Sequence, residues 1–212
     1  FLGRALQTVN PPADSVGGSQ LADSAISGQT ALGAEPADTD EFLVSDAGTL
    51  KRMDYSYIKG AGKIGQVVSA VKTDTFSMTS TTFADITDVT VDITPTATSS
   101  KVLIVVQLTG GLTSGYNGNF RLVRDSTVIN LGDAAGSRSQ AMSHFHSNSS
   151  NHTYCNIGSF LDSPSTTSAT TYKVQVNVES GGTVWSGASV YDSDTVQMGR
   201  TTQTITVMEV LA

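Results

Sequence analysis

The sequence has little of several residue types on which common functions depend. Charged residues make up 15% of its 212 residues, against about a quarter in an average globular protein. It contains one cysteine, Cys155, which excludes a disulfide framework within the chain. We expect this thiol to be buried, because free cysteine behaves as a small apolar side chain. No apolar run approaches the roughly 20 residues of a membrane-spanning helix, so we expect no insertion into a membrane.

Basic side chains are scarce as well. The chain has 12 lysine and arginine residues against 19 aspartate and glutamate residues, which gives a net charge of −7. Because phosphate recognition needs clustered basic side chains, this balance argues against nucleic acid as a partner. The sequence also lacks the GxSxG, HExxH, P-loop and CxxC patterns. We therefore expect a protein that is not an enzyme and has no catalytic residues.

Threonine, serine, glycine, valine and aspartate dominate instead, a composition typical of an all-β protein with many turns. The most informative stretch is 102–106, a run of five apolar residues between Pro95 and the pair Gly110-Gly111. β-Branched residues favour a strand, and a strand that is apolar on both faces is covered on both. We predict a central strand with one face in a sandwich core and the other against a second copy of the chain.

Alternating patterns predict a regular β-domain from residue 63 to the C-terminus. In 171–179, apolar residues at even positions alternate with polar residues at odd positions. Turn signals recur at the intervals of a sandwich with about eight to ten strands. The expected strands are 64–72, 75–80, 83–93, 100–108, 119–124, 127–131, 154–161, 171–179, 184–189 and 202–211. Polar loops are expected at 110–118, 132–143 and 147–151.

Residues 1–62 differ from the rest because they contain too few apolar side chains to close a core. We expect a short helix at 20–26 and a hairpin at 41–53, with Gly48 in the left-handed position of a three-residue loop. A lone hairpin is only marginally stable in water. We therefore predict that residues 1–62 form an extended shaft or linker, ordered by partner chains, before a head at 63–212.

Several phrases of the sequence resemble a known family. They are KTDTFSMTSTTFADITDVTVDITPTATSSKVLIVV, FRLVRDSTVINLGDAAGSRS, SFLDSPSTTSATTYKVQV and the terminal TTQTITVMEVLA. Together they resemble the C-terminal domain of marine bacteriophage and cyanophage fibre proteins. The phrases DTDEFLVSDAGTLKRMDYSYI and FLGRALQTVNPPADS resemble the linker and shaft segments that precede such domains. The resemblance covers nearly the whole chain and specifies a class of virion protein rather than a chemistry.

The resemblance implies a homotrimer with jelly-roll β-sandwich heads, similar to tumour-necrosis-factor-like heads, at the distal end of a fibre. It also implies a location in the virion, with attachment to other tail or capsid proteins through the N-terminal side. We expect a tail or capsid fibre protein that adheres to a glycan on the host cell surface. One alternative is a purely structural virion component without a receptor. A glycan depolymerase is a third reading, disfavoured because no coil-length repeat of a long β-helix is visible.

Aromatic residues in or beside predicted loops are the candidates for receptor binding. Tyr116 and Asn117 lie in GYNGN, Trp185 lies in GGTVWSG, and Tyr191 lies in VYDSD. A sugar site combines an exposed aromatic face with fixed polar groups, and these stretches supply both. For Trp185, a place in the core or at a trimer interface is the competing interpretation, because indoles are usually well buried.

The three histidines are candidates for metal binding. His144 and His146 would lie on one face of an extended segment, and His152 follows after a polar tract. Imidazole is the commonest metal ligand. On a threefold axis, His144 and His146 of three chains would supply six nitrogens, an octahedral set. The alternative is three exposed loop histidines, and we expect no other cofactor.

Aspartates are plentiful at the predicted turns. Two of them could hydrolyse a glycan as a carboxylate pair, and Asp192 with Asp194 could bind calcium through oxygen ligands. Turn formation is the commoner role of aspartate, and no glycine-spaced calcium loop accompanies them. The residues concerned are Asp85, Asp88, Asp133, Asp162, Asp192 and Asp194.

Overall fold

The computed structural model describes residues 28–58 and 64–211. The chain divides into two compact units, Phe1–Gly60 and Ala61–Ala212. The helix expected at 20–26 lies outside the described residues.

The described part of the first unit contains the expected hairpin. Strand β1 (Glu41–Asp46) pairs antiparallel with strand β2 (Thr49–Asp54), and a single 3-10 turn (Tyr55–Tyr57) follows. The connecting loop has two residues rather than the predicted three. Ala47 and Gly48 have φ of 50° and 85°, which is the pattern of a type I′ turn. Most of the described side chains of the hairpin are exposed, so the hairpin has no core of its own.

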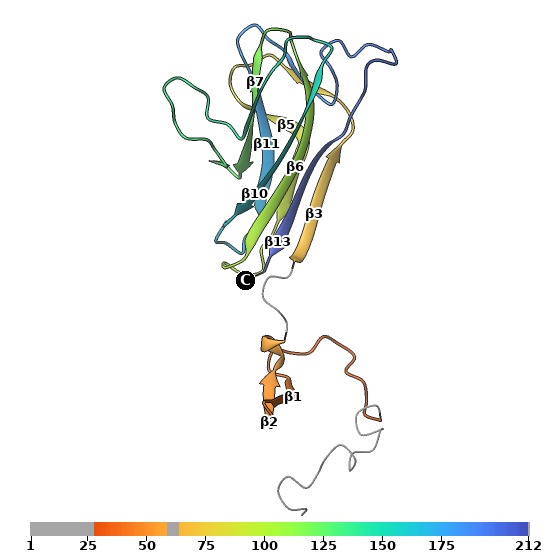
Figure 1. Ribbon diagram of the computed structural model, residues 1–212, viewed down its shortest axis with the longest axis vertical. Coiled ribbons are helices and arrows are strands. Elements are labelled where there is room, and N and C mark those ends of the chain that lie inside the picture. The colour runs from red at the N-terminus through yellow and green to blue at the C-terminus, as the bar shows by residue number, and fades with distance from the viewer. Residues whose placement is uncertain (1–27, 59–63, 212) are drawn as a thin grey trace, which may run out of the picture. The chain divides into compact units, whose positions relative to one another are not determined.

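The second unit is all-β and consists of two antiparallel sheets (Figure 1). The first sheet contains β3 (Ile64–Lys72), β13 (Gln203–Val210), β6 (Lys101–Leu112) and β10 (Thr153–Asp162), with the short strands β4 (Phe76–Met78) and β12 (Val184–Ser186). The second sheet contains β5 (Ala84–Ile93), β11 (Thr170–Val178) and β7 (Asn117–Arg124), with β8 (Thr127–Ile129) and β9 (Ser143–His146). No helix in the described part of the chain is long and apolar enough to span a membrane.

The strand order of each sheet follows from the neighbours of one central strand, β6 in the first sheet and β7 in the second. β6 pairs with β13 along one edge and with β10 along the other, and β12 continues the β13 edge beyond it. β7 pairs with β11 on one edge and with both β8 and β9 on the other. The orders are therefore β3-β13-β6-β10 and β5-β11-β7-β9, with chain crossovers between the sheets. This arrangement is consistent with the jelly-roll-like sandwich that the sequence predicts.

The core lies between the two sheets. Val102, Ile104 and Val106 of β6 are buried, whereas Leu103 and Val105 point to the opposite side of the sheet and are half-buried. Each fully buried aliphatic side chain contributes about 1.5–3 kcal/mol relative to leaving it exposed. The even-numbered residues of β11 are also buried, as the alternation in the sequence predicts; they are Thr170, Tyr172, Val174, Val176 and Val178.

β6 continues further than predicted, through the glycine pair that the sequence suggested as its end. A Cβ at Gly110 would lie 2.5 Å from the carbonyl oxygen of Trp185. A Cβ at Gly111 would lie 2.6 Å from Cα of Ser189. The two glycines therefore let β12 and the turn that follows it lie directly against β6.

The extended segment expected around the histidines is β9. Its backbone pairs with β7, and Phe145 at its centre is buried. The rings of Phe145 and Phe120 stack with centroids 5.0 Å apart and planes 9° apart. This stacking anchors β9 and leaves His144 and His146 on the outward side of the second sheet.

The sandwich has a near end, where β3 begins, and a far end. Ile64 and Lys101 both pair with Val210, so β3 begins where β6 begins and β13 ends. The turns that join the strands at the opposite end define the far end (Figure 1). They are 73–75, 79–83, 113–116, 147–152, 179–183 and 187–202.

A buried polar cluster joins the two sheets close to the end of the sandwich where β3 begins. Nη1 of Arg124 on β7 lies 2.8 Å from Oδ2 of Asp162 on β10, and the hydroxyl of Tyr172 on β11 donates to the same oxygen at 2.7 Å. Burial and the hydrogen bond to Asp162 raise the pKa of the Tyr172 hydroxyl. The cluster therefore ties β10 of the first sheet to two strands of the second.

A second cluster surrounds Glu209 of β13, whose side chain is fully buried and has no basic partner among the residues that the structure describes. Its carboxylate accepts from the backbone N–H and the hydroxyl of Thr96, at 2.6 and 2.7 Å, and from Nε2 of Gln66 at 3.0 Å. Burial alone would raise the pKa of Glu209, but the hydrogen bonds from Thr96 and Gln66 outweigh it and lower the pKa to about 2.

Candidate ligand-binding site

The outward faces of the two sheets differ in chemistry. On the second sheet, polar side chains are bonded to one another across the strands. Nζ of Lys173 and Nε2 of Gln175 both donate to Asp85, and Nε of Arg121 donates to Oε1 of Gln175. We call this surface the polar face; it consists of Asp85, Asn117, Asn119, Arg121, His144, His146, Lys173, Gln175 and Asn177.

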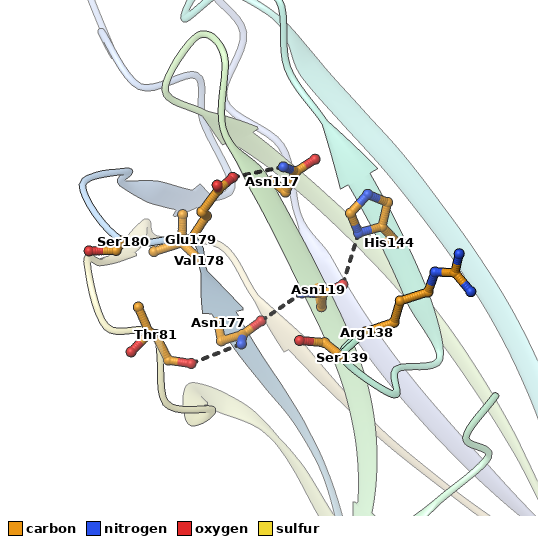
Figure 2. Close-up of a pocket in the computed structure, with 10 residues that line it drawn as sticks. All are labelled: Thr81, Asn117, Asn119, Arg138, Ser139, His144, Asn177, Val178, Glu179 and Ser180. Carbon is orange, nitrogen blue, oxygen red and sulfur yellow. Dashed lines mark hydrogen bonds between the residues drawn. The ribbon is translucent and has the colours of Figure 1, made fainter. Parts of the chain in front are cut away.

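A hollow of about 740 Å³ opens at the far end of the polar face (Figure 2). Strands β7, β9 and β11 supply its floor, and segments outside these strands supply its rim. Most of the side chains that line it are polar. They are Thr81, Asn117, Asn119, Arg138, Ser139, His144, Asn177, Val178, Glu179 and Ser180.

One row of side chains crosses the floor of the hollow. His144, Asn119 and Asn177 pair directly across β9, β7 and β11. Nδ1 of His144 lies 2.9 Å from Oδ1 of Asn119, and Nδ2 of Asn119 donates to Oδ1 of Asn177 at 3.0 Å. Nδ2 of Asn177 donates to the backbone carbonyl of Thr81 at 2.9 Å. Because a carbonyl only accepts, it fixes both amides and makes Nδ1 of His144 a donor, which leaves Nε2 available.

A second row lies beside the first. Nδ2 of Asn117 donates to Oε2 of Glu179 at 2.7 Å, and Oδ1 of Asn117 lies 3.1 Å from Nδ1 of His146. The ionised carboxylate of Glu179 only accepts, so it fixes this amide as well, and His146 also donates from Nδ1. Each row thus begins at an exposed imidazole and ends at an obligate acceptor.

The two rows prepare the hollow for a polar ligand. An asparagine amide has two N–H donors, and each of Asn117, Asn119 and Asn177 uses one of them within its row. The remaining donors have fixed positions, because the rows prevent rotation of the amides. Fixed donors and acceptors in a concave surface are what orient a hydroxyl-rich small ligand.

Charged groups stand on opposite sides of this hollow. Figure 2 shows the carboxylate of Glu179 on one side and the guanidinium of Arg138 on the other. Glu179 is held by Asn117, whereas the exposed guanidinium of Arg138 has no hydrogen-bond or ion-pair partner in the described residues. The hollow therefore has one side suited to an anionic group and one suited to hydroxyl donors.

The predicted receptor-binding residues do not lie together in the structure. Asn117 lies in the hollow, while Tyr116, Trp185 and Tyr191 do not line it. Tyr116 was expected to be exposed but is half-buried against the core, because its ring packs on the turn at Gly181. Trp185 is half-buried on β12, and Tyr191 is 63% exposed in a far-end loop. A binding role for these residues remains a prediction.

The histidines separate into a pair and a single residue. His144 and His146 are both exposed on one face of β9, as the sequence predicts. His152 lies before β10, with its ring edge-on to Tyr154 at 6.3 Å. Within the described residues, no group of three or more histidine, cysteine, aspartate or glutamate side chains could hold a metal ion. A metal bound by His144 and His146 of several chains stays a prediction.

Asn119, Asn177 and Arg138 are residues of the hollow that the sequence did not single out. A signal for the asparagines exists, since Asn117 and Asn119 alternate with core residues on β7, and Asn177 does so on β11. The alternation marks them as outward, but it does not show that β7 and β11 are neighbours. Arg138 lies in a loop, where no periodicity marks its position.

The outward face of the first sheet carries apolar side chains among neutral polar ones, which include Ser69, Gln107, Ser159, Thr204 and Thr206. Its most exposed apolar members are Val67 and Val71 of β3 and Ile157 of β10, the last at 74% exposure. Among the side chains at the outward positions of its four long strands, Lys101 is the charged one. We call this surface the apolar face; it consists of Val67, Val71, Leu103, Val105, Ile157, Leu161, Met208 and Val210.

Cys155 lies on the same side of β10 as Ile157 and Leu161, as the sequence predicts. That side faces outward, so the thiol is exposed and the expectation of a buried cysteine is wrong for a single chain. The reason is that the inward side of β10 is occupied by the half-buried residues Tyr154 and Phe160, which pack against the core.

Comparisons with known proteins identify no family. No protein-family model matches the chain, and no curated protein matches it in sequence. Solved structures that match include those of infectious bursal disease virus Gt strain, at 11% identity and a TM-score of 0.40, and Gx strain, at 13% identity and 0.39. Each covers 79% of this chain, and this chain spans 41% and 40% of those chains. At these values the similarity carries no argument about function.

Proposed function

We propose that this chain is a virion fibre protein whose sandwich head binds a glycan on the host cell surface and works without enzymatic activity. The sequence phrases that resemble marine phage fibre proteins support the virion class. The jelly-roll-like sandwich is the architecture that this resemblance implies. The glycan-binding role rests on the hollow of the polar face.

The observation that carries the binding role is the pair of hydrogen-bonded rows in the hollow. A sandwich is stabilised by its core, and the rows His144-Asn119-Asn177 and His146-Asn117-Glu179 lie outside it. Holding polar groups in fixed positions reduces the cost of ordering them when a ligand binds. This arrangement suits recognition of a polyhydroxyl ligand.

The apolar face supports the second part of the proposal, a homotrimer. Val67, Val71, Ile157 and Leu161 are large apolar side chains exposed on this one face, and association with other copies removes them from water. In the trimer, the apolar faces of three heads lie together around the threefold axis. The polar faces, which include His144 and His146, then point away from the axis, where a host glycan can reach them. This arrangement is an alternative to a metal shared by these histidines on the threefold axis.

The lining of the hollow favours binding over glycan hydrolysis. Glycoside hydrolysis uses two carboxyl groups that flank the scissile bond. Among the residues that line the hollow, Glu179 carries the one carboxylate, and it is occupied by Asn117. Release of reducing sugar from a host polysaccharide would nevertheless replace the binding role by a depolymerase.

A glycan array tests the proposal directly. The parent chain should bind a limited set of glycans, and His144→Ala should lose that binding without loss of stability, because the imidazole is exposed. His152→Ala is the matched control, since it removes another exposed imidazole outside the hollow. If the assembled parent chain binds no glycan, the purely structural virion component replaces the adhesin. If His144→Ala binds as the parent does, the hollow is not the site.

A further inference from the structure

We propose that the hollow selects an acidic saccharide and that Arg138 receives its carboxylate or sulfate group. This inference rests on the proposed glycan-binding function and names the chemical class of its ligand.

The first argument is the unpaired state of Arg138. The other described arginines are all engaged with protein groups: Arg52 with Glu41, Arg121 with Gln175, Arg124 with Asp162, and Arg200 with Asp192. The guanidinium of Arg138 alone among them has no such partner, and it lies at the rim of the hollow (Figure 2). A guanidinium binds a carboxylate or sulfate through charge-assisted hydrogen bonds.

The second argument is that the groups in the lining that can only donate outnumber the side-chain groups that can only accept. Asn117, Asn119 and Asn177 each keep one unused N–H, and Ser139 and Ser180 add hydroxyl groups. A hydroxyl both donates and accepts, so the serines favour neither kind of ligand, whereas the three amide N–H groups and the guanidinium of Arg138 only donate. The second oxygen of Glu179 only accepts. A ligand rich in acceptor oxygens complements this lining better than a ligand rich in donors.

The third argument is the separation of charge across the hollow. Glu179 repels an anionic group, and Arg138 attracts one from the opposite side. A saccharide with one acidic substituent is therefore oriented, with its acid at Arg138 and its neutral hydroxyls toward Glu179. Since the chain carries a net charge of −7, the attraction by Arg138 is local and cannot come from the general field of the protein.

The test compares ligands that differ only in charge. Titration calorimetry of the full chain measures the affinity for each ligand. To test a carboxylate, oligogalacturonate is compared with its methyl ester. To test a sulfate, a sulfated carrageenan oligosaccharide is compared with its desulfated form. We expect at least one acidic member to bind about tenfold more tightly than its neutral counterpart, as for a hydrogen bond to a charged group. Arg138→Gln should abolish that difference, whereas Arg200→Gln, outside the hollow, should retain it.

The outcomes separate this inference from the proposed function. Equal affinity for the acidic and neutral members overturns the inference and leaves glycan binding in place. A charge preference that persists in Arg138→Gln also overturns it. Absence of binding to both acidic oligosaccharides overturns it as well, while the glycan array decides the proposed function independently.

Discussion

Asn119 stands between His144 and Asn177, with its Oδ1 2.9 Å from Nδ1 of the imidazole and its Nδ2 3.0 Å from Oδ1 of the second amide. The three residues are direct cross-strand neighbours on β9, β7 and β11. The pairing of these strands thus brings together polar side chains that are distant in sequence. The geometry of the proposed site depends on this row.

Removal of Asn177 should damage both the row and binding. Asn177→Ala deletes the bonds to Asn119 and to the carbonyl of Thr81, and we expect a loss of about 1–3 kcal/mol in the free energy of unfolding. Glycan binding should weaken because the amide of Asn119 is then free to rotate. Gln175→Ala is the control, because it removes hydrogen bonds of the same strand outside the hollow, those with Asp85 and Arg121, and should lower stability without weakening glycan binding. Urea unfolding and the glycan array give the two readouts, and parental glycan binding by Asn177→Ala would contradict the role of the row.

Stability should fall in acid through Glu209. Its pKa is lowered to about 2 in the folded chain, from 4.5 as the ordinary value. A group with a depressed pKa stabilises the fold above its unfolded pKa, and this contribution is lost as the pH falls from about 4.5 to about 2. Urea midpoints at pH 7, 5 and 3 should show this loss in the parent.

The variant Glu209→Gln checks the origin of that acid sensitivity. It should be less stable than the parent at pH 7 and should lose less stability between pH 5 and 3, because the ionised carboxylate is absent. Glu35→Gln, which changes an exposed glutamate, should behave as the parent does. Identical acid profiles for the parent and Glu209→Gln would assign the sensitivity to other carboxyl groups.

Gly110 should tolerate no side chain. Gly110→Ala places a Cβ 2.5 Å from the carbonyl oxygen of Trp185, so β12 must move away from β6. We expect a loss above about 3 kcal/mol, because overpacking of a buried contact is one of the mechanisms that give large losses. Gly199→Ala is the matched control, since no atom lies within 4 Å of its added Cβ. Thermal unfolding compares the two, and equal melting temperatures would show that β12 does not rest on β6.

The apolar face should hold the trimer together. Sedimentation of the parent should give three times the chain mass of 22.1 kDa. Ile157→Lys places a charge on the β10 edge of that face, at its most exposed apolar residue, and should give monomers, while Val196→Lys, at a residue 97% exposed in a far-end loop, should remain trimeric. A parent chain that sediments as a folded monomer contradicts the trimer.

The sequence predicted much of the sandwich because alternation reports which residues share one side of a strand. It placed Val174 in the core and grouped Cys155 with Ile157 on one side of β10. Alternation does not say which side faces the core, so the burial of Cys155 was predicted wrongly. The extent of β6 was missed for another reason: Gly110 reads as a turn residue, and only the close approach of Trp185 explains it.

The hollow could be predicted only in part. The sequence analysis singled out Asn117 because it follows the aromatic residue Tyr116, and His144 because of its spacing from His146. It did not predict that Asn117 and His144 share a site. Their contacts with Asn119 and Glu179 depend on which strands pair, and that pairing is long-range. The partial burial of Tyr116 likewise depends on the distant turn at Gly181.

Hydroxyl-radical footprinting of the full chain tests most directly whether the two outward faces are two separate interfaces. In the assembled chain, Ile157 should react far less than the exposed Val196, although Ile157 is 74% exposed in a single chain. His144 should react strongly and become protected only when a glycan identified on the array is added. If Ile157 reacts as expected for a side chain exposed in a single chain, the trimer interface is contradicted. If bound glycan leaves the reactivity of His144 unchanged, the glycan interface is contradicted.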